Sequence, residues 1–396
     1  MQMSESEIKS EKKGNNNFFK RFIAKTAGNI KTFFENAPKV CIGFYFAAAI
    51  ALVIHILSSR IPSFADFIIK YPCAAVRFVL AKLTMWIPFS LAEMIIMLVP
   101  IIFIVLVVVG IIISSKGTTK QYIGMTASLL AAISFFYSTF VFTLAPGYQG
   151  STLDQKLELS ADPVSAEELY DTAVYLTDEI NKIIDSIEFT PNGASVMPYD
   201  LDEMNDKLAT AYRSAAKKYD FISPLNSKLK YVILSEPMSY THITGVYTFF
   251  TGESNINVNF PDYTIPYTAA HELAHQRGTA RENEANFVAF LACMETDDAY
   301  IRYSAYTNML EYVLSALSSA SSELYSSMWE RFDGKTIGEF NAYSIFYKEY
   351  QQSTVSNISS TINNTYLQSQ GVKEGSQSYG LVVDLMVAYH KSGKTG

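Results

Sequence analysis

The chain has 396 residues, of which 49% are hydrophobic, and its formal net charge is −7. The charge is uneven, because residues 1–144 carry +8 and residues 145–396 carry −15. This asymmetry predicts two parts in different surroundings. The acidic part has no basic patch with interleaved aromatic residues, which argues against a nucleic acid partner. The three cysteines predict no disulfide framework, and Cys293 is expected to be a buried, inert thiol.

The N-terminal part combines a basic tail with long apolar stretches. Residues 1–39 hold eight lysines and arginines and are expected to form a cytoplasmic tail. Within a predicted transmembrane region, 40–144, the stretches 40–58, 91–113 and 122–144 are each apolar and long enough to cross a bilayer. No cleavage site follows the first stretch, so it is not expected to be a signal peptide.

Residues 61–89 form a different kind of apolar segment. It carries Asp66, Lys70, Arg77 and Lys82 at helix-like intervals. This pattern favours an amphipathic segment that lies on the membrane. The alternative, a fourth span, would invert the orientation of everything that follows.

The basic segments predict how the chain is oriented in a cell membrane. The tail and the loop with Lys116 and Lys120 are expected to face the cytoplasm. Three spans then place the domain 145–396 outside the cytoplasm. The stretch 145–180 is consistent with this, since it holds one basic residue and eight acidic ones.

The acidic part has an α+β pattern, mostly helical with a small β-sheet. A helix is expected to begin at Pro163, because proline suits the first helical position. Strands are predicted over 228–235, 245–250 and 255–260 from their content of β-branched and aromatic residues. Further helices are predicted near 281–296, 298–326, 336–352 and 376–391.

The sequence HELAH, residues 271–275, carries the chemistry. On a helix, His271 and His275 lie on one face and can hold one metal ion with their ring nitrogens. Glu272 would then lie beside a metal-activated water as the general base of a zinc hydrolase. Zinc lowers the pKa of a bound water toward neutrality.

The third metal ligand has to come from outside this helix. Gly278 can end the helix, and a third histidine three residues further on is excluded because that position is Arg281. Glu282 and Glu284 are the remaining candidates, and they point in different directions on a helix. Glu282 is favoured, because Asn286 on the same face could hydrogen-bond a ligating histidine.

The run HELAHQRGTARENEANFVAFLAC, residues 271–293, resembles zinc metallopeptidases of the gluzincin kind. The chain is most similar to a largely uncharacterised bacterial family of multi-pass membrane proteins, through GVYTFFTGES at 245–254 and SYGLVVDL at 378–385. The resemblance implies that 145–396 is a zincin-like domain behind a three-helix transmembrane region. It also implies a strand edge, from 245–250 or 255–260, that binds an extended substrate.

Peptide hydrolysis also needs a donor for the developing oxyanion. Tyr379, His390 and His242 are the candidates, and Tyr379 is favoured. Glu253 is expected to be a turn carboxylate or to order a loop at the cleft.

Two functions are therefore expected. The first is a membrane-anchored zinc (Zn²⁺) metallopeptidase that acts on a peptide or protein, including cell-envelope substrates. The alternative is a non-catalytic, zinc-containing domain that binds cell-envelope partners.

Overall fold

The chain divides into two compact units. The computed structural model describes residues 25–160, 162–350, 354–370, 372 and 381–394. The first unit takes in the chain up to residue 53 together with 98–138, and the second takes in 54–97 and 139–396. The sequence predicts a domain that begins at residue 145. In the structure, residues 54–97 also belong to the unit that contains the acidic part.

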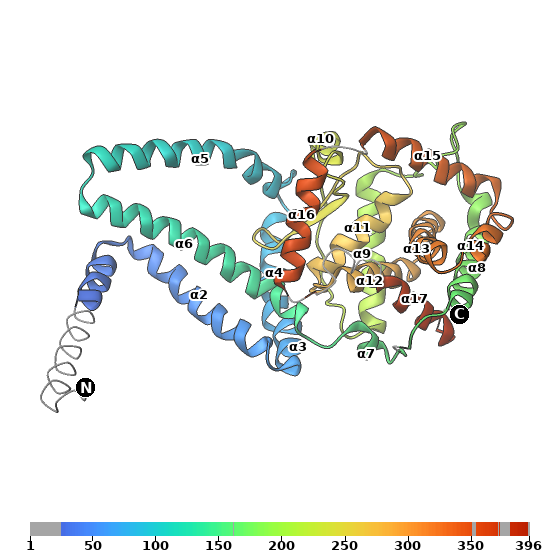
Figure 1. Ribbon diagram of the computed structural model, residues 1–396, viewed down its shortest axis with the longest axis horizontal. Helices are drawn as coiled ribbons and strands as arrows, with labels where there is room; N and C mark the ends of the chain where they lie inside the picture. Colours follow the sequence, from blue (N-terminus) through green and yellow to red (C-terminus); the bar gives the residue numbers. More distant parts are fainter. Residues whose placement is uncertain (1–24, 161, 351–353, 371, 373–380, 395–396) are drawn as a thin grey trace, which may run out of the picture. The chain divides into compact units, whose positions relative to one another are not determined.

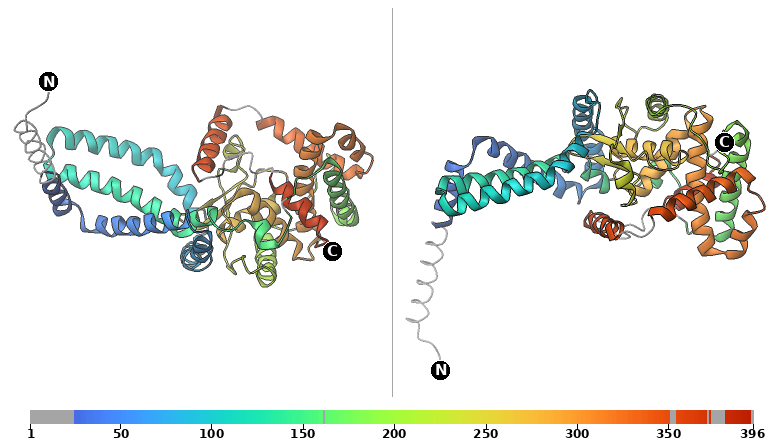
Figure 2. Two further views of the ribbon diagram at one scale, coloured as in Figure 1. Left: turned by 60° about the horizontal axis from the view of Figure 1, so that its bottom comes forward. Right: turned by 90° about the horizontal axis from the view of Figure 1, so that it is seen from above.

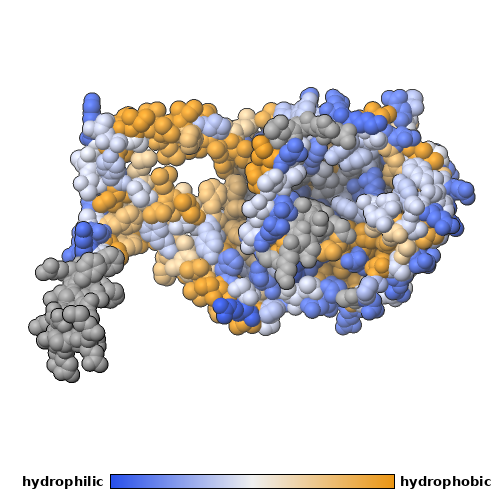
Figure 3. Space-filling model, viewed as in Figure 1, coloured by the Kyte–Doolittle hydropathy of each residue, from blue (hydrophilic) through white to orange (hydrophobic). Residues whose placement is uncertain are grey.

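Three long helices correspond to the predicted membrane spans. α2 (Lys39–Ser58), α5 (Leu91–Lys116) and α6 (Thr119–Thr143) are the helices in the described part of the chain that are long and apolar enough to cross a membrane. The 20 residues of α2 extend about 30 Å, which matches the hydrocarbon thickness of a bilayer. Figure 3 shows hydrophobic side chains over the surface of α5. The prediction of three membrane-capable helices is confirmed.

The segment between the first two spans forms two short helices, α3 (Pro62–Lys70) and α4 (Pro72–Thr84). Each begins at a proline, which lacks the N–H group needed in a helix interior and so separates the two. With 9 and 13 residues, both helices are shorter than a membrane span. One face of α4 is buried in the second unit.

Arg77 on that buried face is 1% exposed, and its hydrogen bonds within the described chain go to backbone carbonyl groups. Its guanidinium group donates to the carbonyl oxygens of Thr143 at 2.7 Å, Ile69 at 3.0 Å and Arg277 at 3.2 Å. These oxygens lie at the C-terminal ends of α6, α3 and α11 (Thr264–Gln276). A cation is favourable at a helix C-terminus, so one side chain holds three helix ends together.

Three buried charged side chains, Lys230, Glu93 and Glu253, join the region around the start of α5 to the sheet. Lys230 donates to the carbonyl oxygens of Thr84, at 2.9 Å, and Ile87. Glu253 accepts from the first backbone N–H groups of α5, while Glu93 accepts from the backbone N–H groups of residues 233 and 234. We call these three residues the polar clamp. Each charged side chain is thus hydrogen-bonded to backbone groups at a helix end or in a turn.

The sheet has three strands in the order β1–β3–β2, with β1 parallel and β2 antiparallel to β3. They are shorter than predicted: β1 is Lys230–Tyr231, β2 is Gly245–Thr248 and β3 is Glu253–Ile256. β3 begins two residues early because Gly252, with φ +72°, closes the turn back to Thr248. The strand predicted over 255–260 is thus central, so its proposed role as a free edge is wrong.

Helices make up most of the second unit, as predicted. Around α11 lie α9 (Leu201–Lys218), α12 (Glu282–Met294) and α13 (Ala299–Ala320), and α13 also packs against α8 (Ala166–Ile183) and α17 (Val382–Lys391) (Figure 1). The sheet lies beside α11 (Figure 2). The remaining helices are η1 (Ala145–Tyr148), α7 (Leu153–Leu157), η2 (Ile184–Ser186), α10 (Ser235–Ser239), α14 (Ser322–Met328), α15 (Gly334–Tyr350) and α16 (Thr354–Ser369).

Two helix predictions differ from the structure. α8 begins at Ala166, not at Pro163, because Ser165 and Glu168 form a capping box. The helix predicted over 298–326 is two helices, since the Ser321 side chain caps the start of α14. Cys293 is buried as expected, and burial raises the pKa of its thiol.

The polar clamp predicts a stability effect. Replacing Glu253 with Ala leaves the N–H groups of the half-buried Leu91 and the buried Ala92 without their acceptor, at a cost of about 1–3 kcal/mol in the free energy of unfolding. We expect a lower thermal midpoint for Glu253→Ala in the full-length protein in detergent, followed by circular dichroism. Glu330→Ala, at an exposed position, is the control. Equal midpoints for the two variants would contradict a stabilising role for the clamp.

Candidate metal centre

The HELAH residues lie on α11, in the middle of the second unit. The helix packs against β3 and β2 and against α12, so 11 of its 13 residues are buried. His271 and His275 lie one turn apart with their rings toward the same point, 4.6 Å between centroids. Their side chains are 12% and 9% exposed, so neither ring is completely shielded from solvent.

A sharp reversal brings Glu282 back to these histidines. α11 ends at Gln276, and Gly278 follows with φ +103°, a conformation that glycine adopts readily. A side chain at this position would also collide with the guanidinium group of Arg77. The chain then turns, and Glu282 is the first residue of α12. The helix-ending role predicted for Gly278 is therefore confirmed.

Three potential ligand atoms form a nearly equilateral triangle. The two Nε2 atoms of His271 and His275 are 3.0 Å apart, and Oε2 of Glu282 lies 3.2 Å and 3.3 Å from them. A tetrahedral zinc ion with bonds of about 2.0–2.1 Å would hold its ligands about 3.3 Å apart. The spacing and the donor types, two imidazoles and one carboxylate, fit such an ion.

The hydrogen bonds of the histidines also fit a metal. Nδ1 of His275 lies 2.7 Å from the carbonyl oxygen of Thr279, which can only accept, so Nδ1 carries the proton. Nε2 then points at the triangle, the orientation that metal-ligating histidines have. Nδ1 of His271 and the side-chain nitrogen of Asn286 are buried without a hydrogen-bond partner in the described chain. The hydrogen bond to a ligating histidine that was expected from Asn286 is made instead by the carbonyl oxygen of Thr279, which accepts from His275.

Burial and the close charges alter the acid–base properties of the site. Burial raises the pKa of Glu272 to about 7, against the opposing effect of the two histidines. Burial by itself lowers the pKa of His275, but the Glu282 carboxylate outweighs it and raises the pKa to about 9. Burial likewise raises the pKa of Glu282, yet the histidines hold that pKa well below its usual range. Glu282 is therefore anionic at neutral pH, as a metal ligand must be.

Glu272 lies beside the triangle, under the strand β2. Its Oε2 is buried with no hydrogen-bond partner in the part of the chain that the structure describes. Gly245 of β2 lies directly against it, because a Cβ atom added there would be 2.6 Å from Oε1. This close approach joins residues far apart in sequence, so HELAH alone gave no indication of it.

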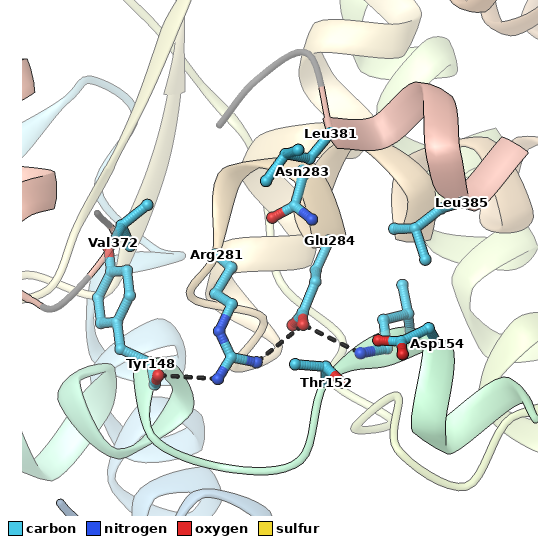
Figure 4. A pocket seen from close by; sticks show the side chains of 10 residues that line it. Tyr148, Thr152, Asp154, Arg281, Asn283, Glu284, Val372, Leu381 and Leu385 are labelled. Atoms are coloured by element: carbon cyan, nitrogen blue, oxygen red, sulfur yellow. Dashed lines mark hydrogen bonds and ion pairs between the residues drawn. The ribbon is translucent and has the colours of Figure 1, made fainter. Parts of the chain in front are cut away.

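Glu284 and Arg281 belong to the opposite side of the first turn of α12. Arg281 donates to Glu284 at 2.8 Å and to the carbonyl oxygens of Tyr148 and Gly150. Glu284 also accepts from the backbone N–H of Leu153. These contacts border a cavity of about 240 Å³ that none of the three triangle residues lines (Figure 4). Because Glu284 is engaged there, the geometry favours Glu282 as the third ligand.

The other site candidates lie elsewhere or outside the described residues. Tyr379 lies outside the described residues. Nε2 of His242 is 2.8 Å from the carbonyl oxygen of Tyr350, and the ring of His390 stacks on Tyr175. Glu253, expected at a turn or a cleft loop, belongs to the polar clamp.

Two tyrosines not singled out in the sequence lie close enough to be influenced by Glu282. Burial raises the pKa of Tyr312 and of Tyr366 to about 12, and the charge of Glu282 adds to both shifts. With 26 tyrosines in the chain, composition gave no reason to choose these two.

The two glutamates can be separated by measurement. We expect Glu282→Gln to lose bound metal, because a neutral amide is a poor zinc ligand. Glu284→Gln, which keeps an acceptor for Leu153, should retain it. Metal content per chain by elemental analysis of the purified full-length variants gives the answer. Loss of metal in Glu284→Gln alone would make Glu284 the ligand.

A match to one known protein family covers most of the chain. The model of a family described as a protein of unknown function, DUF3810, matches residues 71–387. No curated protein and no solved structure matches the chain. The matched range includes α4, two of the membrane-capable helices and the HELAH helix. The chain therefore belongs to the DUF3810 family, whose function is unknown.

Proposed function

We propose that this protein is a membrane-anchored, zinc-dependent metallopeptidase. The observation that carries the proposal is the triangle of His271, His275 and Glu282, whose atoms are 3.0–3.3 Å apart. Support also comes from the hydrogen bond between Nδ1 of His275 and the carbonyl oxygen of Thr279, which orients Nε2 toward the other two ligand atoms. The resemblance to gluzincins in the run 271–293 agrees with this ligand set.

Each residue of the site has a role in the proposed reaction. His271, His275 and Glu282 hold the zinc ion, which when bound polarises a peptide carbonyl and makes water more acidic. Glu272 accepts a proton from the attacking water and passes it to the leaving amine. Its Oε2 is buried and has no partner in the described chain, which suits a group that both accepts and returns a proton.

The strand β2 supplies a place for an extended peptide. It is an edge strand of the sheet, paired with β3 on one side only in the described chain. A peptide that pairs with the other edge would run past Glu272, because Gly245 of β2 packs against that carboxylate. Tyr379, as predicted, or Tyr366 and Tyr312 would donate to the oxyanion.

The proposed site lies outside the cytoplasm. Support comes from the charges that flank the membrane-capable helices: the basic tail and Lys116 and Lys120 on one side, and an acidic stretch after α6 on the other. With three spans, the orientation that these charges favour puts the tail in the cytoplasm and the proposed metal centre on the far side of the cell membrane. The substrate would then be a peptide or protein of the cell envelope.

The role of Glu272 gives the decisive test. Glu272→Gln removes the proton acceptor but leaves the metal ligands intact, so the rate of cleavage should fall by about 10²–10⁴-fold. The full-length protein, loaded with zinc, is incubated with a mixture of synthetic peptides of varied sequence. New peptide termini are counted by mass spectrometry, and metal content is measured on the same samples.

The outcomes separate the two functions. New termini from the wild type, absent from a Glu272→Gln variant that still binds zinc, support the peptidase. A wild type that binds zinc but yields no more termini than Glu272→Gln supports the alternative, a non-catalytic zinc domain. A wild type without metal contradicts both.

The close packing of β2 gives a second prediction. Gly245→Ala places a methyl group within about 3 Å of the Glu272 side chain, so Glu272 or the strand must move. We expect cleavage to drop sharply while bound zinc stays near the wild-type level. Val246→Ala, on the same strand but exposed, is the matched control and should keep its activity. Unchanged cleavage in Gly245→Ala would argue against this position of Glu272 in the working enzyme.

A further inference from the structure

α4 exposes apolar side chains away from its buried face. The buried face includes Cys73, Arg77 and Ala81. Outside it, Val79 and Leu83 are 53% and 66% exposed, and Trp86, just past the helix, is 83% exposed. A helix that faces water normally carries charged side chains there, and exposed apolar patches mark an interaction site.

A second exposed apolar pair adjoins this one. Ile233 and Leu234, which follow β1, are 72% and 42% exposed. The polar clamp fixes their position, because Glu93 accepts from both of their backbone N–H groups. Lys230, three residues before Ile233, bonds the carbonyl oxygen of Ile87, next to Trp86. Lys230 also bonds the carbonyl oxygen of Thr84, next to Leu83, so one side chain joins the strand before Ile233 to the end of α4.

We propose that Val79, Leu83, Trp86, Ile233 and Leu234 form a membrane-contact surface that lies in the headgroup region of the bilayer. The connectivity of the chain indicates that this surface faces the lipid bilayer. The segment with α3 and α4 is joined at one end to α2 and at the other to α5, two helices able to span a membrane. Both ends of the segment are thereby held at a bilayer boundary.

The residue types match this position. Tryptophan is enriched at membrane–water interfaces, because its ring is apolar and its N–H group seeks a polar partner. Lys82 of α4 places its ammonium group 5.8 Å from the ring centre of Phe78, so its stem lies along apolar surface while the charge stays outside. The prediction that 61–89 lies on the membrane concerned this segment alone, whereas the proposed surface also includes the folded domain at Ile233 and Leu234.

The surface ends close to the metal centre. In the sheet, Tyr231 and Gly245 both pair with Ile256, so they stand at the same level on either side of β3. Two strand spacings, about 10 Å, separate them. Gly245 in turn packs against Glu272. If the proposed function holds, substrates that lie on the membrane surface would be within reach of β2.

Tryptophan fluorescence tests the surface directly, because the chain has only two tryptophans. Trp329→Phe leaves Trp86 as the sole reporter. The full-length variant is reconstituted in phosphatidylcholine nanodiscs with lipids brominated at different depths. We expect the strongest loss of Trp86 emission when the bromine atoms lie near the headgroup end of the lipid acyl chain. Loss that is strongest with bromine at the chain terminus would instead place the segment across the bilayer and overturn the proposal.

The complementary variant Trp86→Phe reports from Trp329, which is on the C-terminal side of α14, and should be insensitive to brominated lipid. Adding Ile233→Trp to the variant that lacks both native tryptophans tests the contribution of the folded domain, and its emission should also fall. If brominated lipid quenches neither Trp86 nor the tryptophan introduced at position 233, and aqueous iodide quenches both, the surface faces water and the proposal fails. None of these readouts depends on peptidase activity.

Discussion

The geometry of the candidate metal centre depends on how α11 ends. The chain must turn back within a few residues of His275, or Glu282 cannot reach the two histidines. Gly278 makes the turn possible, and Arg77 fixes it by bonding the carbonyl oxygen of Arg277 together with the ends of α3 and α6. A buried guanidinium group is costly unless a carboxylate or several carbonyl dipoles compensate it, so these three helix ends and Arg77 require one another.

This dependence explains why Arg281 does not signal a defective site. It occupies the position at which another ligand pattern has a histidine, but it serves the fold of the following turn. Its contacts with Glu284 and with the carbonyl oxygens of Tyr148 and Gly150 hold the start of α12 in place. Glu282, one residue later, is thereby presented to the histidines. Arg281 and Glu284 thus hold the start of α12 in place, while Glu282 contributes its carboxylate to the candidate site.

Local patterns predicted much of this architecture. The three membrane-capable helices follow from apolar length, and the placement of His271 and His275 follows from helical periodicity. Strand ends were predicted poorly, because Gly252 and the polar clamp decide them through turns and distant contacts. The bond from His275 to Thr279 and the approach of Gly245 to Glu272 also escaped prediction, since a backbone carbonyl has no sequence signature and the second contact joins separate elements.

The polar clamp determines how this protein can be divided for study. A fragment that starts at residue 145 would lack Glu93 and the carbonyl oxygens of Thr84 and Ile87. Lys230 and Glu253, which are buried in the full chain, would then lose the backbone groups that they bind. Water would have to replace those backbone groups at this end of the sheet. A fragment of the second unit that preserves these contacts therefore keeps residues 54–97, and one without them requires the two charges to be redesigned together.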